Sequence, residues 1–380
     1  MAQTDGAGGV VGVVFGGPSP EHDISILTGL QAARALAADG VDVCCLYWTK
    51  TASWLRVPVT AEAKDFLEPM PNGAVEVDLR VPGGFAERRR MRASAIELDV
   101  VLNCCHGGPG EDGTLTGVLA LAGLAVSGPR PQPSALMMDK LAATGTAAAA
   151  GVPTIATALV PLDGADAAAL QSLPPTPWVV KPRFGGSSLG VEAGVDDLDT
   201  ARALARRGVG RAGMLVQPLL DGWRDVNIAV RTYPELQLSE IERPLRDEST
   251  IYGYHDKYLA GGGGAGMDSA PRELPAKLPP KVREQILDHA RTLVTAFGIT
   301  GAPRIDFLWD GDDQVVLCEV NAIPGAWGAY LWQAIDVSPA RLYRDLVEEA
   351  RRAPGLEPQW AATSDGKALR AAGSIAAKLA

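Results

Sequence analysis

Two carboxylates and one carboxamide lie on a predicted β-hairpin in the last third of the chain. Asp306 belongs to the apolar run PRIDFLWD, Glu319 and Asn321 belong to QVVLCEVNA, and the turn sequence DGDD separates the two runs. This turn predicts antiparallel pairing, and the alternation of side chains along a strand puts Glu319 and Asn321 on one face. Three oxygen ligands on one face suit a hard cation such as Mg²⁺, which completes its shell with phosphate oxygens and water. The alternative is a solvated hairpin, which explains less well why carboxylates are embedded in such apolar runs.

A glycine- and serine-rich turn follows a lysine in VVKPRFGGSSLG, residues 179–190. Lys181 ends a predicted strand and supplies a point charge for a phosphate, while Gly186, Ser187 and Ser188 offer backbone and hydroxyl donors to an anion. The lysine precedes the glycines and a strand should follow, so the motif is not the P-loop G-x-x-x-x-G-K-[ST]. The stretch predicts either an anion-binding loop or a plain hairpin turn.

Two further glycine loops stand where a predicted strand meets a predicted helix. In GGPSPEHDIS, residues 16–25, Glu21 is either a favourable first-turn carboxylate or a ligand for an ammonium group across a cleft. In CHGGPGEDGT, residues 105–114, His106 is either a substrate contact or a structural histidine, and no Cys or His stands at the spacing of zinc ligands. The first loop lacks the G-x-G-x-x-G fingerprint of dinucleotide-binding folds, which disfavours an oxidoreductase.

The surrounding pattern predicts the elements that must position these residues. GVVGVVFGG, VDVCCLYW and LDVVLNCCHGG read as strands, and helical stretches lie between or after them, so we expect a parallel sheet with helices on its faces. We expect further helices over residues 135–150 and 280–297, with densely spaced strands between them that are typical of an antiparallel α+β part. The glycine-rich segment YLAGGGGAGMDSAP has the composition of a linker. We expect domains over residues 1–129, 130–217 and 218–352, followed by a tail over residues 353–380.

Composition excludes several classes of protein. A net charge of −10 argues against nucleic-acid binding by the chain as a whole, but leaves open a local cationic pocket for a small anion. The five cysteines form no C-x-x-C motif, which favours reduced, structural thiols over a disulfide framework or a zinc site. The start of the chain has no basic region leading into an apolar one, and no apolar run is long enough to cross a bilayer. We therefore expect a cytoplasmic protein.

The whole set of motifs resembles that of D-alanine–D-alanine ligases, a family of the ATP-grasp superfamily. The matching motifs, in chain order, are FGGPSPEHDIS, HGGPGEDGTLTG, SALMMDKL, VVKPRFGGSSLG, YGYHDKY, PRIDF and EVNAIPG. The resemblance covers nearly the whole chain and implies an ATP-grasp fold, α/β and α+β, with an N-terminal parallel α/β domain. It also implies a two-step reaction in which a carboxylate attacks the γ-phosphate of ATP to give an acyl phosphate, which an amine then attacks. Amino acids are the implied substrates, and a homodimer is the implied assembly.

The resemblance assigns roles to single residues. The residues implied to bind ATP are Lys140, Lys181, Gly186, Ser188, Gln217, Asp225 and Lys257. Two Mg²⁺ ions, for which Mn²⁺ could substitute, would be held by Asp306, Glu319 and Asn321. The implied catalytic residues are Glu21, Ser187, Tyr258, Arg304 and Gly325, where the Arg304 side chain and the Gly325 N–H form the oxyanion hole. The implied substrate contacts are Glu21, His106, Arg304, Trp327 and Tyr330. The glycine-rich segment after Lys257 would be part of a lid that excludes water.

Three departures from the family pattern bear on substrate choice. Gly185 replaces a glutamate of the phosphate loop, and Gln217 replaces a glutamate near the adenine, although its amide oxygen could still accept a hydrogen bond. After Gly325 the run A-W-G-A-Y replaces one like M-T-x-x-S, so Tyr330 occupies the position of a small hydroxyl residue that binds the second substrate's carboxylate. The Tyr330 hydroxyl could still donate to a carboxylate, but its ring fills volume, and Trp327 adds an apolar wall. The alternative is that both rings merely pack in the core.

Three functional hypotheses follow. The first is a D-alanine–D-alanine ligase proper, and the second is a related ligase whose acceptor, or even donor, is another amino acid or amine. Tyr258 disfavours a ligase of the D-lactate type, which usually lacks that residue. The third is a catalytically inactive ATP-grasp fold that serves as a binding module, against which the retained lysines and metal-binding residues argue.

Overall fold

The protein is described here from a computed structural model. The structure describes residues 9–88, 94–161, 167–207, 213–245, 271–353, 366–372 and 374. Lys257, Tyr258 and the predicted lid segment, residues 261–266, lie outside the described residues. No described helix is both long enough and apolar enough to cross a membrane.

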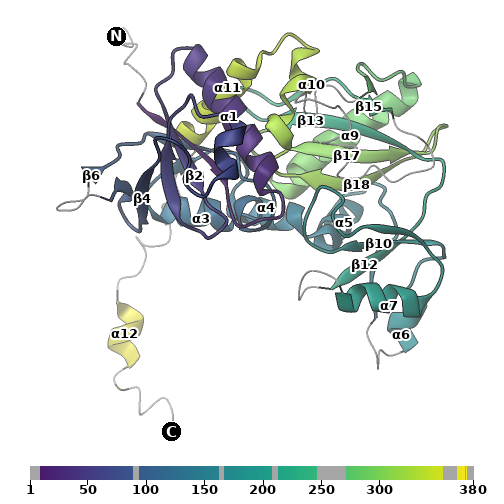
Figure 1. The fold of residues 1–380 in the computed structure, drawn as a ribbon. Coiled ribbons are helices and arrows are strands. Elements are labelled where there is room, and N and C mark those ends of the chain that lie inside the picture. The colour runs from purple at the N-terminus through teal and green to yellow at the C-terminus, as the bar shows by residue number, and fades with distance from the viewer. Residues whose placement is uncertain are drawn as a thin grey trace.

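The N-terminal part is a mixed sheet with helices packed on it, coloured purple to blue in Figure 1. Among the described residues its strands lie in the order β6-β5-β4-β3-β2-β1-β7-β8. The neighbours among β2, β1, β7 and β8 pair in parallel. The neighbours among β2, β3, β4, β5 and β6 pair antiparallel. The strands are β1 (Val11–Gly16), β2 (Val43–Trp48), β3 (Trp54–Val57), β4 (Val75–Arg80), β5 (Gly84–Glu87), β6 (Ser94–Ala95), β7 (Val100–Asn103) and β8 (Ala125–Val126). The helices of this part are α1 (His22–Ala38), the short 3₁₀ helix η1 (Ala63–Leu67), α2 (Gly108–Glu111) and α3 (Thr114–Leu121). The predicted parallel α/β core is confirmed, and the antiparallel strands extend it beyond the prediction.

A helical connection and a small antiparallel sheet follow. The predicted helix over residues 135–150 is two helices, α4 (Pro131–Met138) and α5 (Lys140–Ala149), which break at Asp139. The Asp139 carboxylate accepts from the N–H groups of Leu141 and Ala142 and so caps α5. The sheet has the order β11-β10-β12-β9 and forms the lower right lobe in Figure 1. Its elements are β9 (Ala158–Leu159), α6 (Ala167–Gln171), β10 (Trp178–Pro182), β11 (Glu192–Val195), α7 (Leu198–Arg207) and β12 (Met214–Pro218).

The C-terminal part contains the predicted hairpin. Strands β17 (Arg304–Trp309) and β18 (Val315–Asn321) pair antiparallel, as predicted, in a sheet of order β14-β13-β17-β18. The predicted helix over residues 280–297 is α9 (Pro280–Phe297). The remaining elements are β13 (Arg224–Arg231), β14 (Gln237–Leu238), β15 (Arg243–Pro244), β16 (Arg272–Glu273), the 3₁₀ helix η3 (Gly325–Gly328), α10 (Ala329–Gln333), α11 (Pro339–Arg352) and α12 (Lys367–Ala372).

One continuous apolar core joins the N-terminal sheet to the C-terminal part. Helix α1 packs against both α11 and η3. Figure 1 shows α1 and α11 side by side. Two ion pairs, Asp39 with Arg344 and Asp99 with Arg351, connect the N-terminal sheet and its helix to α11. The loop after β18 is therefore held against the N-terminal domain, which matters for the site below.

Candidate active site

One pocket is lined by nearly every described residue that the sequence singled out. Those that line it are Glu21, His106, Lys140, Lys181, Gly186, Ser187, Ser188, Gln217, Asp225, Arg304, Asp306, Glu319, Asn321, Gly325 and Tyr330. They come from segments up to 309 residues apart, from Glu21 to Tyr330. Trp327 does not line the pocket, because its side chain is fully buried. Its ring packs so closely against Gly128 that any side chain at position 128 would clash with it.

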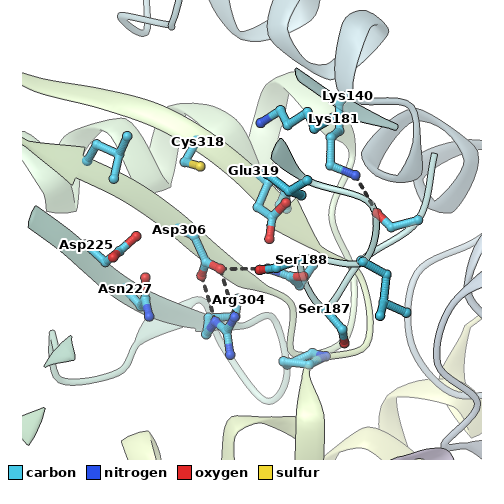
Figure 2. A pocket seen from close by; sticks show the side chains of 18 of the residues that line it. Lys140, Lys181, Ser187, Ser188, Asp225, Asn227, Arg304, Asp306, Cys318 and Glu319 are labelled. Atoms are coloured by element: carbon cyan, nitrogen blue, oxygen red, sulfur yellow. Dashed lines mark hydrogen bonds and ion pairs between the residues drawn. The ribbon is translucent and has the colours of Figure 1, made fainter. Parts of the chain in front are cut away.

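The metal-binding hairpin has a bulge that the sequence pattern did not reveal. Asp306 pairs with Glu319 and Arg304 pairs with Asn321, but Phe307 pairs with Leu317. Cys318 is therefore the extra residue, and it lines the pocket beside Glu319. Figure 2 shows both side chains in the pocket, with Asp306 on the neighbouring strand. Burial raises the pKa of the Cys318 thiol to about 12, so it stays protonated at neutral pH.

Asp306 is held in place by two neighbours. Arg304 donates to both of its carboxylate oxygens, at 2.6 and 2.7 Å, and the Asn321 side-chain nitrogen donates to it at 2.9 Å. All of these atoms lie in the pocket, where Figure 2 draws the bonds as dashed lines. Although burial alone would lower the pKa of Arg304, the charge of Asp306 raises it, so the guanidinium remains a fixed cation at this end of the site.

The donor set of the hairpin fits a hard cation. No group of three or more His, Cys, Asp or Glu side chains in the described part of the chain is arranged as a metal site. A cation would instead rest on two carboxylates, those of Asp306 and Glu319, on the Asn321 amide oxygen, and on oxygens of a bound phosphate. Such an incomplete, oxygen-only protein shell is the kind that Mg²⁺ shares with nucleotide substrates.

The glycine- and serine-rich turn forms a concave backbone loop at the pocket. Ser187 and Ser188 both have left-handed φ values, 53° and 57°, directly after Gly185 and Gly186. Successive backbone N–H groups in such conformations make anion-binding concavities. The Lys140 ammonium donates to the Gly185 carbonyl oxygen, and burial lowers the pKa of Lys140. The loop and its lysines therefore make a cationic end of the pocket, as Figure 2 shows for Lys140 and Lys181.

Glu21 reaches across the cleft to this loop. The Ser187 hydroxyl donates to the Glu21 carboxylate, and a side chain on Gly186 would lie 3.1 Å from it. Glu21 is only 7% exposed, which a solvated first-turn carboxylate would not be. Two members of the expected Glu21–Ser187–Tyr258 set thus lie together, whereas Tyr258 lies outside the described residues.

His106 and a second glutamate bind the loop after β18. The His106 Nδ1 bonds to the Ile323 carbonyl oxygen at 2.8 Å, and its Nε2 bonds to the Thr28 hydroxyl at 2.7 Å. The Glu111 carboxylate accepts from the N–H groups of Ile323 and Gly107, at 3.0 and 2.9 Å. Both ring nitrogens of His106 are thus used within the protein, which favours the structural alternative over a direct substrate contact. Glu111 was not singled out from the sequence, although it belongs to the motif HGGPGEDG.

We expect Glu111 to make the free energy of unfolding pH-dependent. Burial, together with the nearby charge of Glu21, raises its pKa from an ordinary 4.5 to about 7. As the pH rises from 4.5 to 7, the unfolded chain loses this proton and the folded chain keeps it, so stability falls by up to about 3 kcal/mol and then levels off. Denaturant unfolding at pH 5 and pH 7.5 should show a smaller loss for Glu111→Gln than for the wild type. The exposed Glu284→Gln is the control, and equal losses in all three proteins would contradict the expectation.

Tyr330 forms a cluster with Glu242 and Arg272 in the wall of the pocket. Its hydroxyl donates to Glu242 at 2.5 Å, and Arg272 lies over its ring at 4.2 Å from the centroid. Arg272 also donates to Glu242 at 3.3 Å, as does the Asn227 amide at 3.0 Å. Burial raises the pKa of Tyr330, with the Glu242 charge adding to the effect, so the phenol stays a donor. Neither Glu242 nor Arg272 was singled out from the sequence, because no motif marks them.

Comparison with known proteins gives a consistent result. Two family models match, the D-ala D-ala ligase N-terminus over residues 10–129 and the D-ala D-ala ligase C-terminus over residues 164–348. A D-alanine–D-alanine ligase of Acidiphilium cryptum is 33% identical over 83% of this chain and 88% of its own length. The crystal structure of the D-alanine–D-alanine ligase of Helicobacter pylori superposes with a TM-score of 0.70 at 26% identity, over 89% of this chain and 99% of that one.

A second solved structure shares the fold. The VanG D-Ala:D-Ser ligase of Enterococcus faecalis superposes with a TM-score of 0.73 at 24% identity, over 90% of this chain and 99% of that one. The two family models together match most of the chain, and the matched ranges include every site residue named above as lining the pocket except Lys140. This chain belongs to the D-alanine–D-alanine ligase family of ATP-dependent carbon–nitrogen ligases.

Proposed function

We propose that the protein joins the carboxylate of one amino acid to the amine of another at the expense of ATP, through an acyl phosphate. The observation that carries this proposal is one pocket that has a cationic loop at one side, a carboxylate-bearing hairpin at its centre and an arginine beside it. That combination suits phosphoryl transfer to a carboxylate followed by attack on the activated carbonyl. D-Alanine is the donor that family membership suggests.

In the first step the protein's task is to hold ATP and the donor in line. Lys140, Lys181 and the backbone N–H groups of the loop over Gly186 and Ser188 would bind the phosphates. Gln217 and Asp225 would contact the adenine and the ribose, and Lys257 would approach the phosphates from the lid. Bound Mg²⁺ would neutralise charge on the phosphates, held by Asp306, Glu319 and Asn321.

The first amino acid would be fixed by its two charged groups. Glu21 is the proposed partner of the ammonium group, because its carboxylate is buried and oriented by the Ser187 hydroxyl. A buried carboxylate attracts a substrate cation more strongly than an exposed one does, because little water screens the two charges. The donor carboxylate would then lie toward the hairpin, where the γ-phosphate is transferred to it.

In the second step an amine attacks the acyl carbon and phosphate leaves. The charge that develops on the carbonyl oxygen would be stabilised by Arg304 and by the Gly325 N–H, which both line the pocket. Arg304 needs no reorganisation to act, because its two bonds to Asp306 already fix the guanidinium. Exclusion of water matters throughout, since water would hydrolyse the acyl phosphate.

The acceptor distinguishes two forms of the proposal. A D-alanine–D-alanine ligase would need a small hydroxyl residue to bind the acceptor carboxylate, and Tyr330 stands at that position. Because the Tyr330 hydroxyl is bonded to Glu242 and its ring is packed against Arg272, neither is free to rearrange cheaply. We therefore favour a member of the family with an acceptor other than D-alanine. An inactive binding module is disfavoured because the lysines and the metal-binding residues expected of an active ligase are retained in the sequence.

Assembly and location complete the proposal. We propose a homodimer, as expected from the family resemblance. All five cysteines are free thiols, and three of them are fully buried or nearly so, which suits a reducing compartment that also supplies ATP. We therefore propose a cytoplasmic enzyme.

Incubation with Mg-ATP and a panel of D- and L-amino acids tests the proposal. We expect ADP release that depends on D-alanine together with a second amino acid or amine, and a product whose mass equals the two substrates minus water. Efficient formation of D-alanyl-D-alanine would overturn the divergent acceptor but keep the ligase. No ADP release with any pair would favour the inactive module.

A further inference from the structure

The loop that carries the proposed oxyanion donor is held by side chains of the N-terminal domain. This loop comprises residues 322–326: Ile323 lies between β18 and η3, and Gly325 and Ala326 are the first two residues of η3. Glu111 accepts from the Ile323 N–H, His106 bonds to the Ile323 carbonyl oxygen, and the Thr28 hydroxyl accepts from the Ala326 N–H at 3.0 Å. Thr28 lies on α1 and His106 follows β7, so both belong to the N-terminal domain, whereas the loop belongs to the C-terminal part.

The donors and acceptors in this chain of bonds are fixed by chemistry. A carbonyl oxygen can only accept, so the His106 Nδ1 must carry the proton that bonds to Ile323. Burial lowers the pKa of His106 to about 4, so at neutral pH its Nε2 is bare and accepts from the Thr28 hydroxyl. The Thr28 oxygen can then accept from Ala326, and every group in the chain is satisfied with one proton arrangement.

The backbone of this loop would not keep its shape without such support. Ala326 and Trp327 both have left-handed φ values, 47° and 55°, which residues with a side chain rarely adopt. Besides Thr28, the Tyr343 hydroxyl holds the loop by donating to the Ala326 carbonyl oxygen at 3.1 Å, and the fully buried Trp327 ring anchors it. Gly325 lines the pocket, and among the described residues no backbone carbonyl outside the helices and strands accepts a hydrogen bond from its N–H.

We propose that Thr28, His106 and Glu111 are positioning residues that hold the Gly325 N–H at the oxyanion site from the opposite domain. The proposal rests on the proposed function, since it takes Gly325 to be the oxyanion donor. In this proposal His106 acts by holding the loop and does not contact the substrate. It also predicts that losing one bond of the chain slows attack on the acyl phosphate more than formation of the acyl phosphate.

Thr28→Val tests this with little change of shape, and Thr28→Ser keeps the hydroxyl as the matched control. We expect Thr28→Val to lower kcat for the complete reaction on the order of tenfold with little change in the KM for ATP, because a donor displaced by part of an ångström loses much of its effect. Positional isotope exchange in ATP with the first amino acid alone reports acyl-phosphate formation, and it should stay near the wild-type rate. Thr28→Ser should behave as the wild type. Equal losses in exchange and in turnover, or no loss of turnover, would overturn the proposal.

The tautomer of His106 gives a test that does not need activity. Nitrogen-15 spectra of the wild-type protein, with the His106 signal assigned by His106→Gln, should show a neutral ring protonated at Nδ1. A ring protonated at Nε2, or a charged ring at pH 7, would overturn the proposed chain of bonds. If the wild type turns over no amino acid but the ring is protonated at Nδ1, the ligase proposal fails, while the hydrogen bonds that hold the loop are still supported.

Discussion

Glu319→Gln is expected to lower turnover by about 10²- to 10³-fold. Glu319 faces Asp306 across the hairpin, and these are the two carboxylates that β17 and β18 place in the pocket. Glutamine keeps the size and one oxygen but removes the charge, so the phosphates lose part of their neutralisation during transfer. Loss of a single preorganised electrostatic contact at a transition state commonly costs this much. The folded structure should change little, because Glu319 is partly exposed to the pocket rather than packed in the core.

The Mg²⁺ dependence separates this cause from a general defect. Turnover of Glu319→Gln should recover in part as the Mg²⁺ concentration is raised, since a weakened site fills at higher concentration. Glu284→Gln on the exposed face of α9 makes the same chemical change away from the pocket and should leave turnover unchanged. Unchanged turnover in Glu319→Gln would remove Glu319 from the mechanism.

The parts of the site that lie on strongly patterned segments could be predicted from the sequence. The hairpin was predictable because an Asp-Gly turn separates two apolar strands, and α9 was predictable because an apolar period of 3.6 runs its whole length. The parallel core around β1 followed from alternating strand and helix patterns. These features depend on neighbours in sequence, which is why the residue pattern alone indicates them.

The parts that were missed depend on contacts between distant segments. The bulge at Cys318 arises from the pairing of β17 with β18, and the helix break at Asp139 is stabilised by Arg183, which lies 44 residues away. Tyr330 could be placed near the acceptor from a resemblance, but its bond to Glu242 joins residues 88 positions apart. Thr28 and Ala326 are 298 positions apart. No local pattern encodes such pairs, so a sequence read without its fold cannot reveal them.

Tyr330→Ser is expected to shift acceptor preference toward D-alanine, by about 10- to 100-fold in the ratio of kcat/KM values. The change removes a buried ring from the wall of the pocket, at the proposed acceptor site, and restores the small hydroxyl residue that the family resemblance implies there. A difference of a single methylene in a pocket already discriminates between substrates by about 10- to 200-fold. Glu242 would keep its bonds to Asn227 and Arg272, so its buried charge stays paired. A loss of stability of about 2–4 kcal/mol accompanies the change, because the ring leaves a cavity.

Tyr330→Phe decides whether the ring or the hydroxyl selects the acceptor. Phenylalanine keeps the volume and the contact with Arg272 but cannot donate to Glu242. If the ring excludes D-alanine, Tyr330→Phe should keep the wild-type preference while Tyr330→Ser loses it, with kcat/KM measured for each acceptor of the panel. If the hydroxyl instead binds the acceptor carboxylate, both variants should lose the wild-type acceptor, and the bond to Glu242 would have to break on binding. Identical acceptor profiles in all three proteins would remove Tyr330 from acceptor recognition and leave it as a packing residue of the Glu242 cluster.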